Sequence, residues 1–132
     1  MSYRIADASK LEWEERPPAV EGQEPRQAAD VTTAAGLTQS RGRVWRYPPG
    51  TRGRRHADKA QEEVFVVISG RLTMLLGEPP DRVDVGPESV VAVEPMTPLQ
   101  VRNESDEELV LFIYGAPPVD EGADFFDDPG DL

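Results

Sequence analysis

The sequence predicts an all-β protein built as a barrel or a sandwich. Short β-branched and aliphatic runs recur between residues 37 and 116, and turn residues such as Pro48-Pro49-Gly50 and Ser69-Gly70 separate them. No segment combines a helical period with capping residues. At 132 residues, the chain is long enough for one ordinary domain and too short for two.

The β-domain is expected over residues 31–116, between an irregular N-terminal arm (1–30) and an acidic flexible tail (117–132). The arm is rich in charge and proline, but scattered large apolar residues, Trp13 above all, suggest that it packs on the domain or on a partner subunit. In chain order, the expected strands are 31–35, 41–47, 53–57, 63–68, 71–76, 81–85, 90–93, 98–103 and 108–115.

The tail has two interpretations. It is acidic with one aromatic pair, Phe125-Phe126, which is typical of a disordered solubilising end. Alternatively, the two phenylalanines dock on the domain or cap the mouth of a pocket.

Two of the expected strands are apolar at every position. The runs at 64–68 and 109–114 offer no face designed for water, whereas a small barrel buries only one face internally. The other face should therefore pack against a second copy of the chain, and we expect a two-fold homodimer.

Composition excludes several kinds of protein. There is no cysteine, so disulfides, thiolate zinc sites and cysteine nucleophiles are ruled out, and His56 is the only imidazole. A formal charge of −11 disfavours nucleic acid and anionic membranes as partners. No apolar run is long enough to span a membrane and the N-terminus lacks a leader pattern, so we expect a soluble, cytoplasmic protein.

Basic residues gather in one part of this acidic chain. Between residues 41 and 59 a single acid, Asp58, accompanies seven bases: Arg41, Arg43, Arg46, Arg52, Arg54, Arg55 and Lys59. They are either solvated charges paired with the acidic ends, or the rim of a pocket that attracts a carboxylate or phosphate. Arg52 and Arg54 share strand parity with His56, which favours them as ligand-binding residues.

Three metal-ligand residue types lie close together in the sequence. His56 and Asp58 are two residues apart and share a strand face, and Glu63 begins the next apolar run. A hairpin would bring Glu63 back beside His56. The sequence therefore predicts that His56, Asp58 and Glu63 converge.

Residues 41–116 resemble the cupin superfamily. Gly50, His56, Glu63 and Gly70 are in register with its first motif, and Asp58 stands where a second histidine is usual. Its second motif is recognisable in residues 86–103, with Leu99 at the histidine position. The resemblance implies a double-stranded β-helix (jelly-roll) barrel and a divalent metal such as manganese, iron or zinc, for which His56, Asp58 and Glu63 are the remaining ligands.

Two functions follow as expectations. One is a cupin that binds a small organic ligand, anionic if the arginines contribute, in an apolar pocket lined by Phe65, Val67, Leu99 and Val101. The alternative is a metal-dependent oxygenase or isomerase, in which His56 or Glu63 acts as general base. A structural or interaction protein that works through its acidic ends is a third class. The sequence alone leaves open whether the protein is an enzyme.

Overall fold

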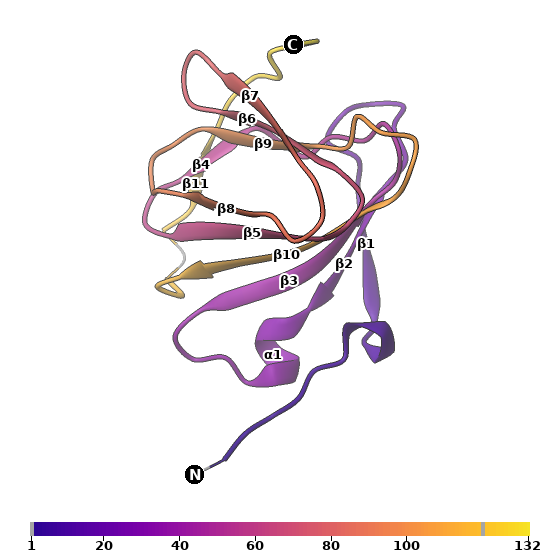
Figure 1. The fold of residues 1–132 in the computed structure, drawn as a ribbon. Helices are drawn as coiled ribbons and strands as arrows, with labels where there is room; N and C mark the ends of the chain where they lie inside the picture. The colour runs from indigo at the N-terminus through magenta and orange to yellow at the C-terminus, as the bar shows by residue number, and fades with distance from the viewer. Residues whose placement is uncertain (1, 120) are drawn as a thin grey trace.

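The computed structural model describes residues 2–119 and 121–132, which form two antiparallel sheets facing one another (Figure 1). The larger sheet has the order β1-β2-β3-β10-β5-β8 and the smaller β11-β4-β9-β6-β7. Their bounds are β1 Trp13–Arg16, β2 Arg26–Asp30, β3 Arg41–Tyr47, β4 His56–Asp58, β5 Glu62–Ser69, β6 Leu72–Leu76, β7 Asp81–Val85, β8 Val90–Val93, β9 Leu99–Arg102, β10 Leu109–Ala116 and β11 Ala123–Phe125. The predicted all-β class is confirmed.

The hydrophobic core lies between the two sheets. Phe65 and Val67 of β5 point inward from the larger sheet, and Met74 of β6 with Leu99 and Val101 of β9 meet them from the smaller one. All five side chains are buried. Successive side chains of a strand alternate between its two faces. The residues that alternate with these five on β5, β6 and β9 therefore point away from the space between the sheets.

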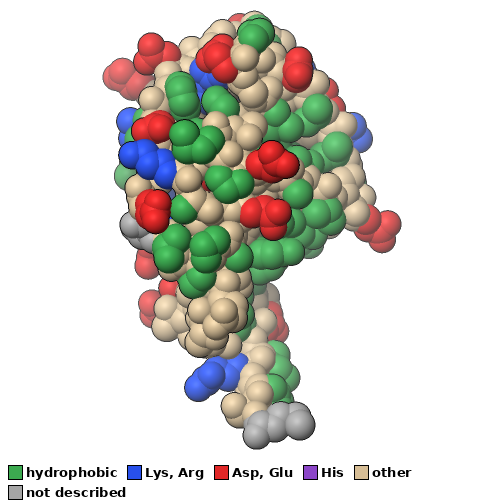
Figure 2. Space-filling view, turned by 90° about the vertical axis from the view of Figure 1, so that its left-hand side faces the viewer, with side chains coloured by type: hydrophobic (Ala, Val, Ile, Leu, Met, Phe, Trp, Pro, Cys, Tyr) green, Lys and Arg blue, Asp and Glu red, His purple; other side chains and the backbone are tan. Residues whose placement is uncertain are grey.

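The outward face of the larger sheet keeps apolar residues at the surface. Figure 2 shows apolar side chains at the surface of one side of the molecule, with acidic side chains between them. Val66 of β5 pairs with Val90 of β8 and with Phe112 of β10, so the three share this face. Val90 is 61% exposed and Ile68 52%. The dimer predicted from these runs stays a prediction.

The first 30 residues are more regular than expected. β1 and β2 extend the larger sheet, with Ala29 of β2 paired to Val44 of β3. Trp13 is held by Arg46, whose guanidinium carbon lies 4.0 Å from the ring centroid. The segment before η1 (Ala8–Lys10) projects from the body, and Tyr3 is 86% exposed (Figure 1).

The strand predicted at 31–35 is wrong, because these residues form helix α1 (Val31–Ala35). Asp30 caps its start by accepting a hydrogen bond from the Thr33 amide, and Gly36 ends it with φ of 63°. These two caps outweigh the β-propensity of Val31 and the threonines. Within the described residues, no helix is long and apolar enough to cross a membrane.

The acidic tail is docked on the body. β11 pairs antiparallel with β4, which places Phe125 opposite His56. The amide of Phe126 donates to the carbonyl of Arg55 at 3.0 Å. Residues 123–125 are therefore part of the smaller sheet, which agrees with the docked interpretation of Phe125 and Phe126 and not with a free end.

Candidate functional site

A cavity of about 460 Å³ opens where β3 and β5 of the larger sheet face β4 and β11 of the smaller one. It contains the only histidine, two acids and three arginines. The side chains that matter below are Arg26, Arg41, Arg43, Trp45, Tyr47, His56, Asp58, Gln61, Glu63 and Phe125.

His56 and Glu63 lie side by side, although the hairpin predicted to join them is wrong, because β4 belongs to the smaller sheet and β5 to the larger one. β4 and β5 carry them, and His56 Nε2 lies 3.4 Å from Glu63 Oε1. The other ring nitrogen, Nδ1, is 3.0 Å from the carbonyl oxygen of Arg54. Since a carbonyl only accepts, Nδ1 carries the hydrogen, and Nε2 faces Glu63 either as a lone pair or as the second N–H of an imidazolium.

Two opposing influences set the charge of this pair. Burial disfavours the imidazolium, but the Glu63 contact, the Arg54 carbonyl and the charge of Asp58 together hold the pKa of His56 above its ordinary value. Glu63 Oε1 is buried, and at 3.4 Å its contact with Nε2 is longer than a strong hydrogen bond. The pair is thus suited to exchange a proton with a bound polar group.

Asp58 has a different local role. Its Oδ1 accepts hydrogen bonds from the amides of Ala60 at 3.0 Å and Gln61 at 2.8 Å, which fixes the turn between β4 and β5. The residue lines the same cavity as His56 and Glu63. Among residues 2–119 and 121–132, however, no group of three or more His, Cys, Asp or Glu side chains is placed to hold a metal ion.

Among the described residues, the structure therefore shows no complete metal centre. Leu99, at the position of a usual metal ligand, pairs across the sheet with His56 and is buried in the core. Only His56 and Glu63 present donor atoms to one another, and two donors are fewer than stable transition-metal sites use. The predicted metal centre of His56, Asp58 and Glu63 stays a prediction.

Three arginines line the cavity: Arg26 of β2, and Arg41 and Arg43 of β3. Arg41 donates to Gln61 Oε1 at 3.3 Å, and Arg26 donates to the hydroxyl of Tyr47 at 3.3 Å. Within the described part of the chain, none of the three has a carboxylate oxygen within ion-pair distance. The cavity wall therefore carries positive charge that the protein does not neutralise by direct contact.

Two aromatic side chains complete this wall. Trp45 and Tyr47 follow Arg43 on the same face of β3, with ring centroids 6.0 Å apart. Burial raises the pKa of Tyr47, and the nearby Arg26 opposes that rise, so the phenol stays neutral at ordinary pH. The wall offers flat apolar surface beside the guanidinium groups.

The six predicted ligand-binding residues lie elsewhere. Phe65, Val67, Leu99 and Val101 are packed in the core and do not line the cavity. Arg52 forms ion pairs with acids of the tail, and Arg54 lies over the ring of Phe125, its guanidinium carbon 3.7 Å from the centroid. Whether they contact a ligand stays a prediction.

Sequence reasoning found part of the positive wall. Arg41 and Arg43 belong to the basic group that was interpreted as a possible pocket rim, and the structure places both at the cavity. It missed Arg26, whose segment was taken as irregular. No local signal identified it, because Arg26 reaches the cavity through the pairing of β2 with β3, in which Ala28 lies opposite Trp45 and Ala29 opposite Val44.

The comparison with protein families gave one match. The family model described as "Cupin domain" matches residues 43–114, which is more than half of the chain. A comparison with curated proteins gave no match.

Solved structures resemble this fold over nearly its whole length. A protein with a double-stranded β-helix domain from Klebsiella pneumoniae is 18% identical, with 95% of this chain and 98% of that one covered and a TM-score of 0.72. The polyketide cyclase RemF from Streptomyces resistomycificus gives 15% identity, 97% and 88% coverage and a TM-score of 0.77. A sugar phosphate isomerase of the cupin superfamily from Silicibacter pomeroyi gives 20%, 96% and 94%, and 0.70. Identities this low establish the fold alone.

Proposed function

The chain belongs to the cupin-domain family, and we propose that it binds a small organic anion in the cavity between β3, β4, β5 and β11. The observation that supports this most directly is that Arg26, Arg41 and Arg43 line one cavity and, within the described residues, have no carboxylate oxygen at ion-pair distance. Although the chain has 25 acids for 14 Lys and Arg residues, these three arginines are gathered on one wall of the cavity. A bound carboxylate or phosphate would supply the missing counter-charge.

The remaining walls support a particular kind of anion. A volume of about 460 Å³ lies within the range of small-molecule sites. Trp45 and Tyr47 offer ring faces to a flat or cyclic body, and the His56–Glu63 pair can donate to or accept from a hydroxyl or carbonyl. We therefore propose a ligand whose anionic end contacts the arginines and whose polar group reaches His56.

Calorimetric titration with defined anions tests this proposal. Citrate, malonate and glucose 6-phosphate serve as probes, and neutral glucose serves as the uncharged comparison. Arg43→Gln should weaken binding about tenfold, because one charge-assisted contact is lost. Arg71→Gln removes the same charge from a residue that does not line the cavity, so it should leave binding unchanged.

The outcomes separate specific binding from general attraction. Equal weakening by Arg43→Gln and Arg71→Gln would mean that anions respond only to net charge. No binding of any charged probe beyond that of glucose would remove the basis for an anion site.

A metal-dependent oxygenase or isomerase is the second candidate. Glu63 Oε1, buried beside His56 Nε2 without a good hydrogen bond, is the observation that favours it, because both atoms are metal-ligand types. Relatives of the fold named as an isomerase and as a cyclase agree with enzymatic use of such a cavity. In this candidate, Glu63 or His56 is also the general base.

Elemental analysis of protein purified without chelators distinguishes the two candidates. About one equivalent of manganese, iron or zinc per chain, lost in Glu63→Ala, would favour the metal-dependent enzyme. Metal well below one equivalent, together with anion binding, would favour the metal-free binding protein.

A further inference from the structure

The C-terminal segment, residues 121–132, forms part of the cavity wall. Phe125 of β11 lines the cavity, and its ring centroid lies 6.3 Å from that of His56. Arg54 holds the same ring, its guanidinium carbon 3.7 Å from the centroid. The position of this short strand therefore bears on how open His56 is to solvent.

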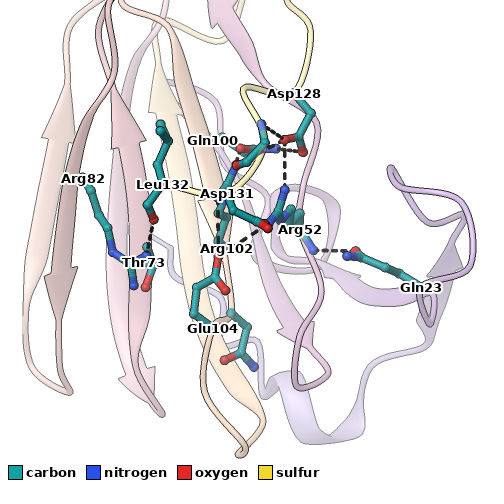
Figure 3. Close-up of polar contacts among 12 residues, drawn as sticks. Gln23, Arg52, Thr73, Arg82, Gln100, Arg102, Glu104, Asp128, Asp131 and Leu132 are labelled. Atoms are coloured by element: carbon teal, nitrogen blue, oxygen red, sulfur yellow. Dashed lines mark hydrogen bonds and ion pairs between the residues drawn. The ribbon is translucent and has the colours of Figure 1, made fainter.

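The same segment is fastened three residues further on. Asp128 Oδ1 accepts hydrogen bonds from Arg52 Nη1 at 2.9 Å and from Arg102 Nη2 at 3.2 Å, and its Oδ2 accepts one from Gln100 Nε2 at 3.0 Å (Figure 3). We call Arg52, Gln100 and Arg102 the carboxylate site. Gly130 adds a backbone contact, because its carbonyl accepts from Arg102 at 2.7 Å.

The carboxylate site is built as a receptor for an anion. Arg102 and Gln100 are each 1% exposed, and a buried guanidinium is costly unless an anion pairs with it. Arg52 lies close enough to add like-charge repulsion, which together with burial lowers the pKa of Arg102. Glu104 lies 3.5 Å from Arg102 Nη1, and Asp128 adds a second carboxylate at 3.2 Å from Nη2. The hydrogen bonds from Gln100, Gly130 and Arg52 outweigh burial to hold the pKa of Asp128 below its ordinary value.

The site and the cavity lie on different faces of the smaller sheet. Leu99 and Val101 point into the core, so Gln100 and Arg102, which alternate with them on β9, point outward. None of the three residues of the carboxylate site lines the cavity. A change at Asp128 can therefore act on the cavity only through the position of the segment.

Within the described residues, a few other contacts hold β11 and the residues beside it: Lys59 lies 3.6 Å from Asp124, the Phe126 amide donates to the Arg55 carbonyl, and Asp131 lies 2.8 Å from Arg52. β11 is a three-residue edge strand with β4 as its only sheet neighbour, and strands this short are marginal by themselves. Two residues separate Phe125 from Asp128, so release at the carboxylate site also frees the chain next to Phe125.

We propose that Arg52, Gln100 and Arg102 form a docking site for the chain's own acidic C-terminal segment, and that docking of Asp128 holds Phe125 as a removable cover beside His56. The proposal concerns access to the cavity and is independent of what binds there. It predicts an open form in which the segment leaves β4 and a two-arginine carboxylate site becomes free.

Chemical modification of the single histidine measures this cover. Diethyl pyrocarbonate reacts with the free ring nitrogen, and the ultraviolet absorbance of the product reports His56 alone among histidines. At fixed pH, Asp128→Ala should speed this reaction roughly tenfold, because several charge-assisted hydrogen bonds are lost. Asp127→Ala is the matched control, since Asp127 is the neighbouring acid outside the carboxylate site, and it should react at the wild-type rate.

Hydrogen exchange and salt complete the experiment. The Phe126 amide, which donates to Arg55, should exchange faster in Asp128→Ala, while peptides of β5 and β10 keep wild-type exchange. Faster exchange in β5 and β10 would mean that Asp128→Ala loosens the whole domain. The test is then made on the wild-type protein with added salt, which should speed modification of His56 by screening the ion pairs of Asp128. Unchanged modification of His56 in Asp128→Ala, or in salt where salt is the test, overturns the proposal.

Discussion

Gly70 lies at a position where the backbone excludes a side chain, and its substitution tests the fold that carries the cavity. It follows β5 with φ of 83°, in the left-handed region that favours glycine. An added Cβ would collide with the carbonyl oxygen of Glu108 and lie 3.0 Å from the Cα of Leu109. Leu109 begins β10 and is fully buried, so these backbone atoms cannot move aside without disturbing the larger sheet.

Gly50 supplies the matched control for this change. Its φ is 76°, and a Cβ there would meet no atom within 4 Å. Gly50→Ala should therefore lower the free energy of unfolding by the conformational cost alone, about 1 kcal/mol. Gly70→Ala should add a steric cost of about 1–3 kcal/mol, for a total of about 2–4 kcal/mol.

Urea unfolding followed by circular dichroism measures both losses. The difference between the two variants isolates the collision with Glu108 and Leu109, because the left-handed backbone is common to both. Equal losses would refute the reasoning, since they would mean that β10 yields to the added methyl group at no cost.

Four further predictions concern the site, the tail, the core and assembly. Glu63→Gln should lower the pKa of His56, measured by NMR titration of its ring proton. Because the pKa of His56 is raised in the folded state, the His56–Glu63 interaction contributes its full stability below the unfolded pKa. That stability is lost as the pH rises through the folded pKa. Asp128 has a lowered folded pKa, so its contribution should be lost as the pH falls through that value, and acid unfolding of Asp128→Ala should lack this step. Phe65→Ala should cost about 3–5 kcal/mol in urea unfolding, because a fully buried ring is deleted. If the predicted homodimer forms through the exposed apolar face, Val90→Lys should give a monomer by light scattering, and a monomeric wild type would contradict the dimer.

Strands were predictable where local pattern and burial agree. The predictions at 41–47, 81–85 and 90–93 match β3, β7 and β8, because β-branched or aliphatic residues recur in each run and turn residues separate the runs. α1 was missed because β-propensity was weighed above capping. Asp30 and Gly36 were the signal that identifies a short helix.

Long-range pairing accounts for what the sequence did not reveal about the site. His56 and Glu63 are close in sequence and meet in the structure, but not through the predicted hairpin, because β4 lies in the smaller sheet and β5 in the larger one. Arg26 reaches the same cavity only because β2 pairs with β3, and no local rule specifies that pairing. Asp128 likewise meets Arg52 across 76 residues, a contact that requires the whole smaller sheet.

A single position on β9 bears on whether the cavity binds an anion or a metal ion. Leu99 pairs with His56, so the side chain nearest to the imidazole across the sheet is apolar. Glu63 is the acidic neighbour of His56 Nε2. The positive charge that no described carboxylate contacts lies elsewhere in the cavity, on β2 at Arg26 and on β3 at Arg43. Leu99→His would place a third donor type opposite His56 and beside Glu63. If the lost donor is what limits metal affinity, this variant should take up zinc that the wild type does not retain through dialysis; equal retention by both would mean that the arginine wall, and not Leu99, determines what the cavity binds.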